Sequence, residues 1–343
     1  MKKAVIIFNP NSGNKRFKLD DVIRCETILK NYGYESATYV TRYKSHASEI
    51  IESLEEVDLV LSIGGDGTFN EVMSGNLKRK KRLVLSHLPV GTTNDIGAMF
   101  GLGKDIEKNL KLILNGTVKE IDICSVNNRI FVYVAGFGKF MNVPYETPRK
   151  MKKRIGYFAY LIEAAKYFLQ KTSLYECTYE VNGEKYHGLY SFALISNANR
   201  IAGINNFYKD VKLNDNTFEV LLCNLEKKKD IVKSLLYLKT NDITKVPGFY
   251  FHKTNHFKIE FKEKLKKPWC IDGEELDINT KKYEISIIRN IKMMIPTKNI
   301  DKLFIEEQEE VPKKKSKAKK TQTKKKDQEK DELSKRTRKN TKK

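Results

Sequence analysis

The sequence lacks any long hydrophobic run, which argues against a conventional membrane-spanning helix. No uninterrupted apolar stretch approaches the roughly 18 residues that a bilayer crossing requires. The apolar run from Ala4 to Phe8, behind Met1-Lys2-Lys3, imitates a signal peptide but ends too soon, at Asn9-Pro10. We therefore expect a cytoplasmic protein that reaches any membrane from the aqueous side.

Cysteine is sparse and widely spaced. No Cys-x-x-Cys pair occurs among the five cysteines, which are Cys25, Cys124, Cys177, Cys223 and Cys270. This spacing argues against both a disulfide framework and a zinc site. We expect buried, reduced thiols.

Acidic residues are outnumbered, and unevenly so. The chain carries a net charge of +22, to which residues 311–343 contribute +12 through 16 Lys and Arg against 4 Asp and Glu. The remaining +10 suits an acidic substrate or an anionic surface. The tail, residues 306–343, has almost no large apolar side chains and is predicted to be disordered. Its basic clusters could bind anionic lipid, bind nucleic acid, or serve only to keep the protein soluble.

The first 125 residues alternate between strand and helix patterns. Helical apolar spacing covers residues 19–30 and 105–114, and a further helix opens at Ser45 and His46. Ser45 would cap that helix, and His46 fits a helix-start or packing role better than a catalytic one. Strand-length apolar runs cover residues 3–8, 34–40, 59–63 and 82–88. This alternation predicts an α/β fold with a doubly wound parallel sheet.

Beyond Ser125 the pattern changes to short β segments, with a hairpin signal at Asn182-Gly183 and one helix from about Ile155 to Leu169. The expected strands are 131–138, 175–181, 189–196 and 220–223, followed by 284–288 and 291–295, which return to the first domain. A chain of 343 residues can form two domains. We predict a nucleotide domain over 1–125 with about 290–305, a β-rich sandwich domain over 126–289, and the tail.

The most informative stretch runs from Leu59 to Glu71. An apolar strand breaks off into Gly64-Gly65-Asp66-Gly67, and the helical pattern resumes at Phe69. Three glycines in four residues permit unusual backbone angles and let main-chain N–H groups approach a phosphate. Asp66 would repel phosphate, so its useful role is to hold Mg²⁺, whereas Thr68 can cap the helix or donate to phosphate. A tight turn whose Asp bonds its own backbone is the structural alternative.

Three other segments place polar residues in or at the ends of predicted strands. They are Asn9 to Gly13, Gly91 to Asp95, and Asp122 between two isoleucines. An open α/β sheet binds its ligand at the carboxyl ends of its strands. Each segment also has an explanation that needs no ligand. Asn9 to Gly13 can be a turn that ends a strand, Gly91 to Asp95 can hold an Asn-Asp helix cap, and Asp122 can be a structural Asp.

Together these segments resemble the diacylglycerol kinase family. Gly64 to Glu71 resembles the nucleotide loop of diacylglycerol, sphingosine and ceramide kinases and, more distantly, that of NAD kinases and phosphofructokinases. The continuation Phe69-Asn70-Glu71-Val72 and the segment Gly91-Thr92-Thr93-Asn94-Asp95 resemble the lipid-kinase branch. Residues 154–160 and 196–198 also look like family segments, so the resemblance spans roughly residues 3–300.

The resemblance implies roles for particular residues. A water-mediated magnesium network would join Asp66, Asp95 and Asp122, and Asp66 would also count as catalytic. The nucleotide ATP would be held by Asn9, Pro10, Asn11, Ser12, Gly13, Thr41, Gly65, Asp66, Gly67, Thr68, Phe69, Asn70, Glu71 and Thr92.

The resemblance also assigns the Asp272-Gly273-Glu274 turn. Glu274 would be the general base that takes the proton of the lipid hydroxyl. Glu275 is the less favoured base, and a solvated hairpin is the structural alternative. A structural magnesium ion would be held by the side chain of Asp215 and the carbonyls of Lys212 and Thr217, with an ion-free turn as the alternative.

Two positions depart from the family pattern. Ala98 stands where an Arg is often found, so any phosphate or headgroup contact of that Arg is absent or moved. Asn216 replaces a Gly in the loop with Asp215, and Asn tolerates left-handed geometry.

The resemblance therefore implies an ATP- and Mg²⁺-dependent lipid kinase, similar to bacterial diacylglycerol kinases, that makes phosphatidic acid. It implies a cytoplasmic enzyme bound peripherally to an anionic membrane; nucleic acid is not an expected partner, and a homodimer is left open. Three alternatives remain: a kinase for a sphingoid base, ceramide or polyprenol, an NAD kinase, or a non-catalytic basic protein that tethers to membrane or nucleic acid.

Overall fold

The computed structural model describes residues 1–12, 17–91, 94–138, 173–201, 204–205, 207–224, 244, 246–276, 278, 280–298 and 300–305. Met1 to Ile305 group as one unit. The helix predicted from Ile155 to Leu169, the family segment over 154–160 and the tail lie outside the described residues. The predicted division into an ATP-binding and a lipid-binding domain stays a prediction.

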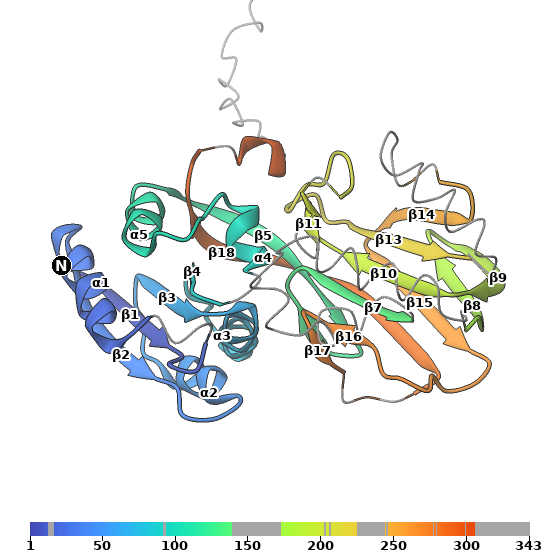
Figure 1. The fold of residues 1–343 in the computed structure, drawn as a ribbon, viewed down its shortest axis with the longest axis horizontal. Helices are drawn as coiled ribbons and strands as arrows, with labels where there is room; N and C mark the ends of the chain where they lie inside the picture. The colour runs from blue at the N-terminus through green and yellow to red at the C-terminus, as the bar shows by residue number, and fades with distance from the viewer. Residues whose placement is uncertain are drawn as a thin grey trace, which may run out of the picture. The chain divides into compact units, whose positions relative to one another are not determined.

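The N-terminal half is a parallel sheet with helices on both faces (Figure 1). Its strands, in the order β2-β1-β3-β4, are β2 (Tyr34–Val40), β1 (Lys2–Phe8), β3 (Leu59–Gly64) and β4 (Leu85–Pro89). One face packs against α2 (His46–Ser53) and α3 (Asp66–Lys78), and the other against α1 (Leu19–Asn31) and α5 (Ile106–Leu114). The doubly wound α/β arrangement is confirmed.

One long strand, β18 (Lys282–Ile295), joins this sheet to the β-rich half. It runs parallel to β4 at Met293 and antiparallel to β5 (Thr117–Val126) and β15 (His256–Phe261). Its register against β5 shifts between Ile288 and Ile291, where Asn290 has a φ of 63°. The two strands predicted at the end of the chain are therefore one strand with a bulge.

The sheet continues from β15 to the hairpin of β8 (Tyr175–Val181) and β9 (Glu184–Tyr190). Asn182 and Gly183 form its turn with φ angles of 53° and 82°, which confirms the hairpin signal. A turn at Asn127 and Asn128 leads from β5 into the short β6 (Arg129–Phe131), which pairs with β5.

A second, antiparallel sheet packs on the far half of the first. Its order is β14 (Phe249–Thr254), β13 (Phe218–Cys223), β10 (Phe192–Ser196), β7 (Val134–Gly138), β16 (Cys270–Ile271) and β17 (Glu274–Glu275). The two sheets share one buried cluster in which Trp269 is fully buried, so the predicted sandwich is confirmed. The runs 131–138 and 189–196, each predicted as one strand, are each divided between the two sheets.

The remaining elements are short: α4 (Asp95–Met99), β11 (Arg200–Ile201), β12 (Ile204–Asn205) and η2 (Asp301–Leu303). All five cysteines are buried, as the sequence predicts, and none of them forms a disulfide. In the part of the chain that the structure describes, no helix combines the length and apolarity that a bilayer crossing needs.

Candidate functional site

The glycine turn between β3 and α3 is closely packed. Helix α3 begins at Asp66, so the prediction that helix resumes at Phe69 is three residues late; Gly65 occupies the N-cap with a φ of −92°. None of Gly64, Gly65 and Gly67 has a positive φ. Gly64 is needed for space, because a Cβ there would lie 2.5 Å from the Thr68 side chain, whereas a Cβ at Gly65 or Gly67 would come no closer than 3.5 or 3.4 Å to a neighbour.

The residues after β1 contact this turn. Nδ2 of Asn9 donates to the Thr68 hydroxyl at 2.8 Å, and the Gly65 N–H donates to the Ser12 hydroxyl at 3.2 Å. Thr68 therefore lies at the third position of α3 facing the first loop, and does not cap the helix. Pro10 and Asn11 are exposed in the same loop, and Gly13 lies outside the described residues.

The segment after β4 meets the glycine turn backbone to backbone. A Cβ on Gly91 would lie 2.7 Å from the Cα of Gly65, and the Val90 N–H donates to the Gly64 carbonyl at 2.8 Å. Asn94 is the N-cap of α4 with a φ of 51°. Thr92 lies outside the described residues. Three segments predicted separately thus meet at one edge of the sheet.

Asp66 and Asp95 form a buried pair of carboxylates at this edge. The Asp66 carboxylate accepts the N–H groups of Asp95 and Ile96 at 3.1 and 3.3 Å. Burial, and next the charge of Asp95, raise the pKa of Asp66 from 3.8 to about 7. Asp95 in turn accepts Nε of Arg200 at 3.0 Å. A carboxylate in this setting suits an added cation, because a positive charge relieves both effects.

Asp122, the third predicted magnesium residue, has other partners. Its carboxylate accepts the Asn216 N–H at 2.8 Å and lies 4.0 Å from Nε of Arg289. Burial raises its pKa. Across the described ranges, no group of three or more His, Cys, Asp and Glu side chains is arranged to hold a metal ion. The magnesium network therefore stays a prediction.

The second predicted metal loop has its carboxylate engaged. Asp215 accepts the Thr217 N–H at 3.0 Å through one oxygen and lies 2.6 Å from Nζ of Lys253 through the other. Nζ of Lys212 donates to the Lys302 carbonyl at 2.8 Å. Asn216 has the left-handed φ of 59° that its replacement of Gly requires. The loop forms as expected, and its metal ion stays a prediction.

The Asp272-Gly273-Glu274 turn reaches the glycine turn from the β-rich half. The buried Asp272 carboxylate accepts three backbone N–H groups, from Val132 at 2.6 Å, Tyr133 at 3.0 Å and Val134 at 3.1 Å. Glu274 is thereby placed so that its Oε1 lies 3.4 Å from where a Cβ on Gly67 would stand. Glu275, its neighbour, is exposed.

Four more of the predicted nucleotide residues have structural partners. Phe69 is fully buried with its ring centroid 4.9 Å from that of His87, and Asn70 donates to the Asp272 carboxylate at 2.8 Å. Glu71 accepts the N–H groups of Ser45 and Ala47. Thr41 is buried, and its N–H donates to the Phe8 carbonyl at 2.8 Å.

The turn before α2 differs in part from expectation. Ser45 occupies the N-cap position but makes no side-chain capping bond, and its φ of 71° is left-handed. His46 accepts the Arg42 N–H at 3.0 Å and stacks on Tyr43 with ring centroids 4.4 Å apart. The packing role predicted for His46 is confirmed.

Sequence reasoning missed Lys44 and Arg200. Lys44 lies 3.4 Å from Glu274, and Arg200 pairs with Asp95. Neither residue belongs to a motif, and both partners are distant in sequence. The only sequence signal was Ala98, which stands where the family often has an Arg. It indicated that a contact made by that Arg is absent or has moved.

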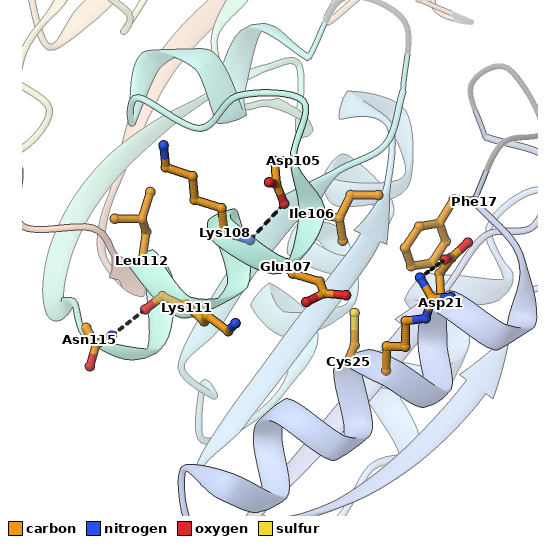
Figure 2. Close-up of a pocket in the computed structure, with 11 residues that line it drawn as sticks. Phe17, Asp21, Cys25, Asp105, Ile106, Glu107, Lys108, Lys111, Leu112 and Asn115 are labelled. Carbon is orange, nitrogen blue, oxygen red and sulfur yellow. Dashed lines mark hydrogen bonds and ion pairs between the residues drawn. The ribbon is translucent and has the colours of Figure 1, made fainter.

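A cleft of about 660 Å³ lies elsewhere, between α1 and α5 (Figure 2). Its lining combines Arg24, Lys108 and Lys111 with Asp21, Asp105 and Glu107. None of the predicted site residues that the structure describes lines it. Burial raises the pKa of its Cys25 thiol to about 12, so this thiol stays protonated at neutral pH.

Comparison with known proteins agrees with the motifs. Residues 3–126 match the family model described as diacylglycerol kinase catalytic domain. A diacylglycerol kinase of Bacillus subtilis is 29% identical over 308 residues, covering 88% of this chain and 99% of that protein. One of Staphylococcus epidermidis is 32% identical over 262 residues, covering 75% and 82%.

The fold is shared with a solved structure. A crystal structure of a diacylglycerol kinase from Bacillus anthracis superposes with a TM-score of 0.69 at 22% identity, covering 86% of this chain and 97% of that one. The motifs, the fold and the level of identity to the Staphylococcus protein agree. The chain belongs to the bacterial diacylglycerol kinase family.

Proposed function

We propose that this protein transfers the γ-phosphoryl group of ATP to the free hydroxyl of diacylglycerol and so makes phosphatidic acid. The observation that carries this proposal is the position of Glu274 against Gly67, one residue from Asp66. Phosphoryl transfer needs the donor phosphates held, their charge offset and the acceptor oxygen aligned. Each requirement has a candidate residue at this edge of the sheet.

The nucleotide would lie on the glycine turn. The first turn of α3 presents backbone N–H groups, and the loop from Asn9 to Ser12 adds small polar side chains; both suit phosphate oxygens. Asp66 and Asp95 would hold Mg²⁺, which supplies charge stabilisation for the phosphates when it is bound.

Glu274 would act on the acceptor. As the lipid hydroxyl oxygen forms its bond to the γ-phosphorus, the Glu274 carboxylate takes the hydroxyl proton. The bond between the γ-phosphorus and the bridging oxygen breaks, and ADP leaves with that electron pair. Glu274 is suited to this step because its side chain is about half exposed, at 47%, and can meet a substrate.

The lipid would be met at a membrane surface. The net charge of +10 over residues 1–310 favours anionic lipid, and the basic tail would add to this attraction. We therefore propose a cytoplasmic enzyme bound peripherally to membrane.

The test is transfer of labelled γ-phosphate from ATP to a panel of lipid alcohols in mixed micelles. The panel holds diacylglycerol, ceramide, a sphingoid base and a polyprenol, with NAD as a soluble parallel acceptor. We expect label in phosphatidic acid above all other products, and only with Mg²⁺ present. Label in phosphorylated NAD alone, or in another lipid alone, would overturn the proposed acceptor.

A further inference from the structure

Lys44 and Glu274 form an ion pair between two segments that are far apart in sequence. Nζ of Lys44 lies 3.4 Å from Oε2 of Glu274, with the side chains 70% and 47% exposed. A pair this exposed contributes little to stability. Stabilisation of the fold therefore does not explain why these two side chains are brought together.

The turn that carries Lys44 is fixed by α3. Glu71 accepts the Ser45 N–H at 2.8 Å through one carboxylate oxygen and the Ala47 N–H at 3.3 Å through the other. Ser45 is held in the left-handed region, at a φ of 71°, which costs energy for a residue with a Cβ. Glu71 thus clamps the residues directly after Lys44.

The residues before Lys44 are fixed as well. The Thr41 N–H donates to the Phe8 carbonyl at 2.8 Å, and the Arg42 N–H donates to Nδ1 of His46 at 3.0 Å. The hydroxyl of Tyr43 donates to Glu49 at 2.6 Å. Lys44 therefore extends from a turn that is anchored on both sides.

Glu274 also extends from an anchored turn. The three backbone bonds to Asp272, with the fourth from Asn70, fix the residues before Glu274 against α3. The same helix therefore carries the clamp for Lys44, through Glu71, and the anchor for Glu274, through Asn70. Oε1 of Glu274 points toward Gly67, while Oε2 faces Lys44.

We propose that Lys44 is a positioning residue that holds one oxygen of Glu274, so that the other oxygen faces the acceptor hydroxyl over the first turn of α3. This inference rests on the proposed function, in which Glu274 is the base. It predicts that Lys44 affects the rate of the chemical step through Glu274, and does not contribute to nucleotide binding.

The first experiment tests the ion pair between Lys44 and Glu274 independently of catalytic activity. A water-soluble carbodiimide couples a neighbouring amine and carboxylate into an amide and takes up the water that is lost. Mass spectrometry of the digested protein should find Lys44 joined to Glu274, and the Glu274→Gln variant should lack this cross-link. Absence of the cross-link in the unchanged protein would overturn the pairing.

The second experiment is a double-mutant cycle on phosphoryl transfer. Lys44→Met should lower kcat about tenfold with little change in the KM for ATP, and Lys44→Arg should restore most of the rate. In the Glu274→Gln background, Lys44→Met should change kcat less than twofold, because its effect passes through Glu274. Lys78→Met, which removes a similar surface pair with Glu52 at 3.0 Å, is the matched control and should leave kcat unchanged.

Three results would contradict the proposal. An unchanged kcat in Lys44→Met would exclude a positioning role, and losses that add in the double variant would show that Lys44 acts independently of Glu274. A raised KM for ATP would instead assign Lys44 to the nucleotide. If the unchanged protein phosphorylates no acceptor, the proposed function fails, and the cross-link distinguishes that failure from a wrong pairing.

Discussion

Asn70 on α3 donates a 2.8 Å hydrogen bond to the buried carboxylate of Asp272, which precedes Glu274 by two residues. This bond ties the helix of the glycine turn to the turn that carries the candidate base. The two halves of the site are therefore connected by a buried polar contact, in addition to apolar packing.

Asp272→Ala should destabilise the protein strongly. Three buried backbone N–H groups and the Asn70 amide would lose their acceptor, and each such loss costs about 1–3 kcal/mol. We expect the free energy of unfolding to fall by at least about 3 kcal/mol in denaturant titrations. The exposed Asp20→Ala should change it by less than about 0.5 kcal/mol. Equal stability of the two variants would mean that Asp272 is not an anchor.

Gly67→Ala should separate activity from folding. Its Cβ would stand 3.4 Å from the Glu274 carboxylate, a contact that the half-exposed side chain can relieve by moving, and Ala favours helix. We expect an unchanged melting temperature and a kcat lowered about tenfold as Glu274 is displaced.

The matched variant is Gly91→Ala, whose Cβ would lie 2.7 Å from the Cα of Gly65. Backbone cannot yield as a side chain can, so this variant should lose stability as well as activity. If Gly67→Ala retained full activity, Glu274 would not need its observed position.

Arg200→Met should remove the guanidinium that pairs with Asp95, beside Asp66. Arg200 and Asp95 are 19% and 3% exposed, so breaking their pair costs about 3 kcal/mol. A divalent cation at the two carboxylates would offset part of this loss, so Mg²⁺ should raise the melting temperature of the variant more than that of the unchanged protein. Equal shifts would argue against a cation site at these residues.

Glu219 should make stability fall as pH rises. This side chain is buried in β13 with Nζ of Lys253 3.9 Å away, and burial raises its pKa from 4.5 to about 8. Because the folded-state pKa is the higher one, the stabilisation is complete below pH 4.5 and is lost as the pH rises toward 8. Melting temperatures between pH 5 and 9 should therefore decline in the unchanged protein and vary less in Glu219→Gln. If the melting temperatures of the two proteins changed in parallel with pH, Glu219 would be excluded as the source of the decline.

Much of the fold was predictable because its signals are local. The buried run of β1, the apolar spacing of α1 and the Asn182-Gly183 turn each specify an element within a few residues of sequence. The division of 189–196 between two sheets was not predictable, because the break at Ser191 depends on which sheet each half joins. The bulge at Asn290 likewise depends on the pairing of β18 with β5.

The candidate site was predictable only where a motif carried it. Asn9 and Ser12 lie in the loop after β1 and Thr68 lies in the first turn of α3 after β3, and the parallel sheet brings such strand ends together. Lys44 and Arg200 act through partners in distant segments, so no local pattern identifies them. Asp122 shows the converse: its motif was recognised, but its partners, Asn216 and Arg289, could not be read from the sequence.

The central claim is that Glu274 is the base that receives the acceptor proton. The most direct measurement compares kcat for phosphate transfer in Glu274→Gln and Glu275→Gln, which remove the same charge from adjacent residues. We predict a loss of about 100-fold or more in Glu274→Gln and less than about twofold in Glu275→Gln, with both variants as stable as the unchanged protein. Equal rates in the two variants, or a larger loss in Glu275→Gln, would contradict the account.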